Sequence, residues 1–336
     1  MNNMSETATK LEDERDDPNE WLEQITCDLG IRQHLDYELL KENGEYKKSA
    51  SPSWYPSDLG KDLYTRYIKR KGVEGLPFDA RTLRKFEIGK LWEAKLHLVL
   101  DARIARGEGN MLEVDLNPEA ENEAFKKRVE NNELELRGFY DRMLLVNDPK
   151  MGWIIVVYEI KSVASRSFHH QKKEGEQPLG NRMQMMFYLE RIFINKENWN
   201  KLVKFCQDKY QITPVKAVGV LSQVSKDDGS MWERTYEFDP ALYARIEQEI
   251  VTLNDYWVRG VEPPKPTVLL IENGIARLNW EVSYSSYVHC ILGADYVAKL
   301  KRAEQLVRRH AYYRKSNPTK VGSVEEEIRL FNESCK

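Results

Sequence analysis

Cysteine is scarce in this chain: there are four among 336 residues, at positions 27, 206, 290 and 335. They form no Cys-x-x-Cys pair and no Cys/His cluster, so the sequence indicates neither a zinc site nor a disulfide framework. Scattered single cysteines are typical of reduced thiols, and we expect a cytoplasmic, DNA-associated protein.

Long apolar runs are also absent, and the first residues show no charged-then-apolar signal pattern, so we expect no membrane association. A Gly-rich nucleotide loop with a Walker lysine is missing, so helicase or ATPase activity would have to come from a partner. Neither sign of charge is in excess, because 51 Lys and Arg stand against 54 Asp and Glu, for a formal net charge of −3. The chain therefore lacks the positive charge of a protein that coats DNA without specificity.

Three ionisable side chains interrupt two segments that are otherwise apolar. Glu159 and Lys161 lie two residues apart within residues 152–163 and so point to the same face of a predicted strand. Both faces of that strand are apolar apart from this pair, which is typical of a central strand. Asp141 interrupts the preceding predicted strand, residues 133–146, and the turn-rich residues between the two strands favour a hairpin.

Such a group of charges needs a compensating partner, because half-buried charges cost several kcal/mol or more unless they pair or hold a metal. Oxygen ligands alone favour Mg²⁺ or Mn²⁺, which polarises a phosphate and lowers the pKa of a bound water. Lys161 would orient that water, and the reaction class is phosphodiester hydrolysis. The alternative is that Glu159 and Lys161 form a structural ion pair at the end of a strand, since Glu-x-Lys is common by chance.

Four short motifs follow one another along the chain: Gly89-Lys-Leu-Trp-Glu93, Gly138-Phe-Tyr-Asp141, Glu159-Ile-Lys161 and Gln184-Met-Met-Phe-Tyr188. Their order and spacing resemble the PD-(D/E)xK nuclease superfamily, in particular its RecB-type exonuclease branch, which includes CRISPR-associated and viral recombination exonucleases. The resemblance implies a restriction-endonuclease-like α/β core, with a mixed central β-sheet flanked by helices.

The resemblance also implies a set of ligands for Mg²⁺ or Mn²⁺. It assigns metal binding to Glu93, Asp141, Glu159 and the backbone carbonyl of Ile160, and it makes Asp141, Glu159 and Lys161 the catalytic centre. Taken alone, Glu93 has another interpretation, as a solvated helix acid paired with a neighbouring basic residue.

Four further residues are expected to meet DNA. The resemblance places Gln184 and Tyr188, four residues apart on one face of a helix, against the scissile strand. Lys172 and Lys173 lie in residues 165–180, which have loop composition and would sit at the mouth of the site. A mobile, solvated loop is the alternative interpretation for the two lysines.

Two basic segments with interleaved tyrosines, residues 61–71 and 299–315, have the composition of a surface that tracks a nucleic acid strand. The alternative for both is a solvated amphipathic helix.

The chain departs from the resembled branch at its ends. In many members of the branch, segments near the two ends carry four cysteine ligands of an iron-sulfur cluster. Here Asp62, Val282 and Ser285 stand at three of those positions, and Cys290 lies near the fourth. Because such clusters typically need four thiolates, we expect no iron-sulfur cluster.

We predict an N-terminal arm and helix in residues 1–50, a nuclease core in 51–260, and a C-terminal helical extension packing on the core in 261–336. The predicted function is a metal-dependent DNA nuclease, an exonuclease, in recombination, repair or replication. Expected partners are DNA and a single-strand-annealing, helicase or replication protein, with the oligomeric state left open. The alternatives are a catalytically inactive DNA-binding or assembly subunit, and a small-molecule metallohydrolase, which the lack of metal-binding histidine spacing disfavours.

Overall fold

The computed structural model describes residues 31–45 and 50–336, so the expected arm before residue 31 lies outside the described residues. The chain divides into two compact units, Met1–Lys47 with Pro77–Glu87, and Lys48–Leu76 with Ile88–Lys336. In the first unit, helix α3 (Ile31–Glu45) carries Asp36, which forms an ion pair with Arg84.

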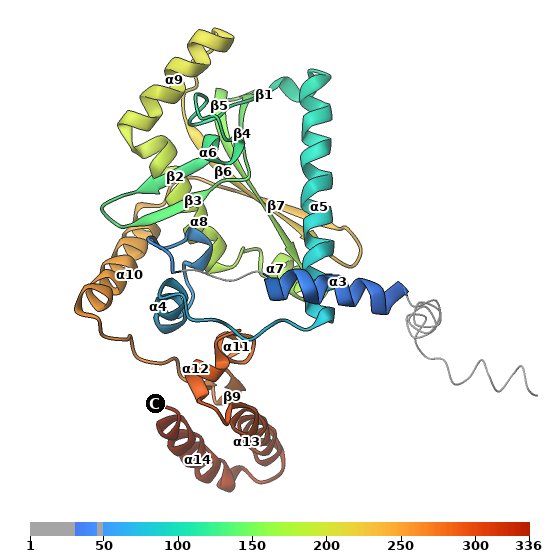
Figure 1. Cartoon of the computed structure of the whole chain (residues 1–336), viewed down its shortest axis with the longest axis vertical. Coiled ribbons are helices and arrows are strands. Elements are labelled where there is room, and N and C mark those ends of the chain that lie inside the picture. The colour runs from blue at the N-terminus through green and yellow to red at the C-terminus, as the bar shows by residue number, and fades with distance from the viewer. Residues whose placement is uncertain (1–30, 46–49) are drawn as a thin grey trace, which may run out of the picture. The chain divides into compact units, whose positions relative to one another are not determined.

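A five-stranded sheet in the order β1-β4-β5-β6-β7 forms the centre of the second unit (Figure 1). Its strands β5 and β6 are parallel and every other neighbouring pair is antiparallel, so the sheet is mixed. The expected α/β class, with a mixed central sheet flanked by helices, is confirmed. The strands are β1 (Met111–Glu113), β4 (Arg142–Asp148), β5 (Gly152–Val163), β6 (Ala217–Ser225) and β7 (Met231–Tyr236).

The predicted hairpin is present as β4 and β5, paired from Arg142 opposite Tyr158 to Asp148 opposite Gly152. The strand predicted over residues 133–146 is wrong in one respect, because it is broken at Tyr140 and Asp141. Its first half, β3 (Leu136–Phe139), pairs instead with β2 (Arg128–Asn131). The buried Tyr140 ring explains the break, since its hydroxyl is held by the Leu116 N–H at 3.0 Å, outside the hairpin ladder.

Helices cover both faces of β5. Helix α8 (Leu179–Leu189) meets the face of the odd-numbered residues, where Gln184 bonds Glu159. Residues 88–105 of helix α5 (Ala80–Ala105) lie beside the other face, where Gly89 is close to Ser162, and Figure 1 shows this part of the helix beside the sheet. Helix α8 packs on β6 so closely that a Cβ on Gly219 would collide with the Met185 side chain. Glycine at both contacts is what allows the helices this close.

Two segments without a periodic sequence pattern contain regular structure. Residues 165–180, predicted as a loop, form helix α7 (Ser165–Glu174), which Phe168 anchors by its complete burial. Residues 110–135, which are rich in Glu and Asn, contain the short elements β1, α6 (Glu123–Lys126) and β2. Each has too few apolar residues to show a period in the sequence, and tertiary contacts decide its structure.

The remaining helices surround this core or follow it. Before the sheet come η1 (Pro56–Asp58), α4 (Leu63–Arg70) and η2 (Glu108–Asn110). Helix α8 continues into a π-helical turn, η3 (Glu190–Ile194), followed by α9 (Lys196–Tyr210) and, after the sheet, α10 (Pro240–Arg259). None of the described helices combines the length and apolar character needed to span a membrane.

The C-terminal region contains a hairpin in addition to the expected helices. The hairpin is β8 (Leu269–Glu272) with β9 (Ile275–Leu278), and the helical elements are α11 (Trp280–Ser283), α12 (Val288–Leu292), α13 (Tyr296–Ser316), η4 (Pro318–Lys320) and α14 (Val321–Ser334). Asn332 fixes α14 to the hairpin by two hydrogen bonds of 2.9 Å with the backbone of Leu269. The region meets α4 through the Tyr64 hydroxyl, which donates to the Cys290 carbonyl.

Candidate active site

The candidate site lies where β5 extends beyond β4. Strand β4 begins at Arg142 opposite Tyr158, whereas β5 continues to Val163 beside β6. Within the described part of the chain, residues 159–163 therefore have a strand neighbour on the β6 side only. Glu159 and Lys161 lie on this overhang, with 2.6 Å between Lys161 Nζ and Glu159 Oε1. Glu159 is 3% exposed and Lys161 is only partly buried, so the ammonium group lies between the acid and solvent.

Asp141 takes over the position that β4 would occupy along the overhang. Its Oδ2 accepts a hydrogen bond of 2.7 Å from the Ile160 N–H, which points toward the β4 side of β5. The break in the predicted strand is what frees the Asp141 side chain to do this. The three predicted catalytic residues, Asp141, Glu159 and Lys161, are thus brought together at one point of the sheet.

Gln184 and Tyr188 hold Glu159 from behind. Gln184 Nε2 donates to Glu159 Oε1 and to the Tyr188 hydroxyl, both at 2.8 Å, and that hydroxyl donates to the Phe139 carbonyl at 2.7 Å. Gln184 is 4% and Tyr188 1% exposed. Both side chains are engaged by these bonds inside the protein, and their contact with DNA stays a prediction. They tie the Glu159 carboxylate to the end of β3, two residues before Asp141.

Glu93 reaches the site from α5, one helical turn after Gly89. A Cβ on Gly89 would lie 2.5 Å from Ser162 Oγ, so glycine permits the close approach of α5 to the overhang. The half-buried Glu93 carboxyl is in electrostatic contact with Asp141 and Lys161. The interpretation of Glu93 as a solvated helix acid is therefore disfavoured.

All three carboxyl groups hold protons more tightly than usual. Burial raises the pKa of Glu159, and the nearby Asp141 raises it further, against the opposing effect of Lys161. Burial also raises the pKa of Asp141, although the Ile160 N–H and Lys161 act against it. The pKa of Glu93 is raised by burial and by Asp141. A divalent cation would relieve the repulsion between acids that are buried close to one another.

The donor set fits Mg²⁺ or Mn²⁺. Glu159 Oε2 is buried and makes no hydrogen bond, although the nearby Asp141 N–H helps to lower the pKa of this carboxyl, so the oxygen is available to a cation. Over residues 31–45 and 50–336, no three His, Cys, Asp or Glu side chains are already arranged as a metal cage. Mg²⁺ does not need one, because it is usually held by one or two carboxylates, together with waters and substrate phosphates. Metal binding by Glu93, Asp141, Glu159 and the Ile160 carbonyl stays a prediction.

Two residues near Asp141 were missed by the sequence reasoning. Lys127 Nζ donates to the backbone carbonyl of Asp141 at 2.8 Å. His97, one turn after Glu93 on α5, is in electrostatic contact with Asp141, and burial lowers the pKa of its imidazole. The spacing of four from Glu93 was a signal for His97, whereas Lys127 stands in a charged run where nothing distinguishes it.

Lys172 and Lys173 lie in the last turn of α7, and both side chains are exposed. The helix is held to the sheet by Phe168 and by a hydrogen bond between Gln171 and Gln223. The two lysines therefore stand on a helix and not on a loop, and their contact with DNA stays a prediction.

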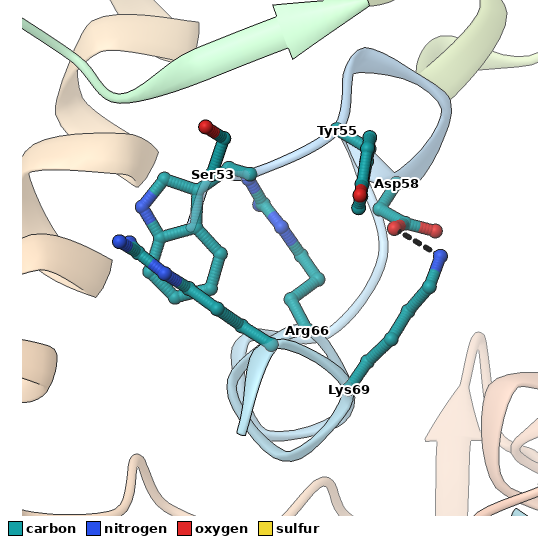
Figure 2. Close-up of a pocket in the computed structure, with 7 residues that line it drawn as sticks. Ser53, Tyr55, Asp58, Arg66 and Lys69 are labelled. Carbon is teal, nitrogen blue, oxygen red and sulfur yellow. Dashed lines mark hydrogen bonds and ion pairs between the residues drawn. The ribbon is translucent and has the colours of Figure 1, made fainter. Parts of the chain in front are cut away.

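The basic segment 61–71 faces inward more than its composition suggests. Arg66 is 3% exposed and pairs with Glu249 at 3.0 Å, while Lys69 pairs with Asp58 at 2.5 Å. Figure 2 shows the long side chains of Arg66 and Lys69 rising from α4 toward the segment that contains Ser53 and Asp58, around a small pocket. Because these cations are already matched by acids, a DNA-tracking role for the segment is disfavoured.

Arg70, on the same helix, is 5% exposed and lies against two indole rings. Its guanidinium carbon is 4.3 Å from the centre of the Trp54 ring and 4.4 Å from that of Trp257. It also donates to Glu135 at 2.5 Å. Cation–π contacts of this kind stabilise by about 0.5–2 kcal/mol each, so Arg70 joins α4 and α10 as a structural residue.

The positions that resemble missing cluster cysteines have other roles in the fold. Asp62 caps α4 by accepting from the Thr65 N–H at 2.7 Å. Val282 is fully buried, and Ser285 Oγ accepts from the Tyr287 N–H at 3.1 Å. The absence of a cluster stays an expectation.

Comparisons with known proteins give distant likenesses only. No family model matches the chain, and no curated protein matches it. A crystal structure of SSO0001 is 18% identical, with a TM-score of 0.36, over 77% of this chain and 94% of that one. A crystal structure of an alkaline exonuclease, LHK-Exo from Laribacter hongkongensis, is 15% identical, with a TM-score of 0.31, over 67% of this chain and 94% of that one. Likeness at this level defines neither the family nor the activity.

Proposed function

We propose that this chain is a deoxyribonuclease that uses Mg²⁺ or Mn²⁺ to hydrolyse phosphodiester bonds in DNA, removing nucleotides from strand ends in recombination, repair or replication. The observation that carries the proposal is the buried Glu159, which keeps one carboxylate oxygen without a hydrogen bond at the point where Asp141 and Lys161 meet. A structural ion pair would not need a free, buried oxygen, because an unmatched polar atom costs about 1–3 kcal/mol.

The chain's own residues have separable tasks in this reaction. The carboxylates of Asp141 and Glu159 are held at fixed positions, because one oxygen of each accepts a hydrogen bond. The donor is the Ile160 N–H for Asp141 and the Gln184 amide for Glu159. Glu93, Asp141, Glu159 and the Ile160 carbonyl would hold the metal. When bound, the metal ion supplies Lewis-acid polarisation of the phosphate and lowers the pKa of a water.

Lys161 would act on the side that faces solvent. Its Nζ is 2.6 Å from Glu159, on a partly exposed side chain that can turn toward an incoming phosphate or water. A lysine here can orient the attacking water and stabilise the negative charge that develops on the phosphoryl oxygens. The RecB-type resemblance of the four motifs supports attack from a DNA end.

The test uses end-labelled single-stranded, duplex and circular DNA with the wild-type chain, Lys161→Ala and Asp141→Asn, in Mg²⁺, Mn²⁺ or chelator. We expect metal-dependent cleavage by the wild type, a loss of about 100-fold or more in both variants, and intact circles. Lys150→Ala, in the turn of the same hairpin, is the matched control and should cleave normally.

The outcomes separate the candidate functions. Cleavage of circles would make the enzyme an endonuclease and overturn the end requirement. DNA binding without cleavage by the wild-type chain would identify a noncatalytic DNA-binding subunit and overturn the proposal.

A further inference from the structure

The break between β3 and β4 leaves two residues, Tyr140 and Asp141, between the two strands and next to the candidate site. They follow the last residue of β3 and precede the first residue of β4. Their N–H and carbonyl groups therefore need partners from elsewhere, because an unpaired backbone group near the core is costly.

One residue supplies partners for two of these four groups. The backbone carbonyl of Lys127 accepts from the Tyr140 N–H at 3.3 Å, and Lys127 Nζ donates to the Asp141 carbonyl at 2.8 Å. Lys127 is itself fixed, because it caps the C-terminus of α6 with its N–H directed at the carbonyls of Ala124 and Phe125. Lys127 thus holds the N–H of Tyr140 and the carbonyl of Asp141, one group on each residue of the break.

The charge of Lys127 also acts on the acids of the site. Burial raises the pKa of both Glu93 and Asp141, and the ammonium group of Lys127 counteracts that rise in each. Lys161 counteracts it as well, so the acids are flanked by two lysines from different parts of the chain. Lys126, the residue before Lys127, is different, because its ammonium group pairs with the Glu123 carboxylate at 2.6 Å.

We infer that Lys127 is a positioning residue for the nuclease reaction, which clamps the Tyr140–Asp141 break so that the Asp141 carboxylate is held for metal binding. This inference rests on the proposed function. Lys127 acts through Asp141 and does not contact DNA, so its loss should weaken metal binding and turnover while DNA affinity stays the same. Partners that hold a metal ligand typically contribute about 10- to 100-fold in metal affinity or activity.

The experiment measures Mn²⁺ binding by calorimetry, kcat and KM on end-labelled DNA, and DNA affinity in chelator. The variants are Lys127→Met, which keeps length and loses charge, Lys127→Arg, which keeps a donor, and Lys126→Met as the matched control. We expect about 10-fold weaker Mn²⁺ binding and lower kcat for Lys127→Met, at unchanged KM and DNA affinity. Lys127→Arg should bind Mn²⁺ within about threefold of the wild type, and Lys126→Met should match it.

Contrary results are distinguishable from failure of the proposed function. Wild-type Mn²⁺ affinity in Lys127→Met, while the wild-type chain binds Mn²⁺ and cleaves DNA, would overturn this inference alone. A wild-type chain that neither binds Mn²⁺ nor cleaves would overturn both. If Lys127→Met does not fold, Lys127→Arg decides, because a 10-fold loss of Mn²⁺ affinity in that folded variant would contradict a donor role.

Discussion

The burial of the Glu159 carboxylate serves the proposed reaction but lowers the stability of the metal-free fold. Its side chain is 3% exposed, one oxygen accepts from Lys161 and Gln184, and the other makes no hydrogen bond. Without a cation, this arrangement costs stability because burial and Asp141 disfavour the ionised form. Groups held in this way for function are often the ones whose replacement stabilises a protein.

We therefore expect Glu159→Gln to raise the stability of the metal-free chain at pH 8. The raised pKa means that the folded state keeps a proton that the unfolded chain releases, so wild-type stability is lost as pH rises through the folded pKa. The Gln amide stays neutral and avoids this loss, so the free energy of unfolding of Glu159→Gln at pH 8 should exceed that of the wild type by about 1–3 kcal/mol. Urea unfolding in chelator measures it.

The pH dependence is the control for this prediction. Below the pKa of an unfolded glutamate, the wild-type carboxyl is protonated in both states, so the gain should vanish near pH 4. A gain that is equally large at pH 4 and pH 8 would contradict an electrostatic origin.

At the scale of elements, the site depends on how closely α5 approaches the β5 overhang. The contact is made at Gly89, where an added Cβ would lie 2.5 Å from Ser162 Oγ. Glu93 lies one turn further along α5, so any shift of the helix at Gly89 also displaces that carboxylate.

Gly89→Ala should accordingly destabilise the chain and reduce cleavage, even though alanine is the better helix former by about 1 kcal/mol. The matched control is Gly322→Ala on α14, where nothing lies within 4 Å of an added Cβ, and where we expect a gain of about 0.5–1 kcal/mol. Thermal unfolding and cleavage assays measure both. A stabilised, fully active Gly89→Ala would show that the helix has room to adjust.

The sequence predicts best those elements that are long and in which apolar residues recur at a regular spacing. The hairpin of β4 and β5 has enough apolar residues to reveal its faces, and with them Glu159 and Lys161, whereas the choice of Glu93 rests on the family resemblance. The break at Tyr140 is not predictable, because it depends on a hydrogen bond from Leu116, far along the chain. Burial of Gln184 and Tyr188 was missed for the same reason, since their partners lie on other elements.

At the scale of the whole molecule, the second basic segment, residues 299–315, has more exposed cations than the first, residues 61–71. Within the second basic segment, Arg302 and Arg309 of α13 pair with Glu327, but other cations of that helix are exposed. These are Lys301, Arg308, Arg314 and Lys315. The exposed Tyr312 stands among them and offers a ring for base stacking.

If α13 follows the nucleic acid backbone, the triple variant Arg308→Ala, Arg314→Ala, Lys315→Ala should bind DNA more weakly. The slope of log affinity against log salt should become shallower by about 0.7–0.9 for each phosphate that the variant no longer neutralises. Fluorescence anisotropy in chelator over a range of salt concentrations measures it. Lys201→Ala on α9, whose lysine pairs with Glu197, is the control. An unchanged slope in the triple variant would assign those cations to solvation alone.

The overhang of β5 has a consequence for how the molecules behave toward one another. A strand with a free side presents backbone N–H groups that a strand from another molecule can pair with, and natural proteins block such edges. Asp141 does this at Ile160, because its carboxylate already accepts that N–H at 2.7 Å. The Asp141 side chain thus also blocks a strand edge that could pair with another molecule. Asn at this position keeps an oxygen that can accept the Ile160 N–H, so Asp141→Asn should leave the edge blocked, whereas Asp141→Ala would expose it.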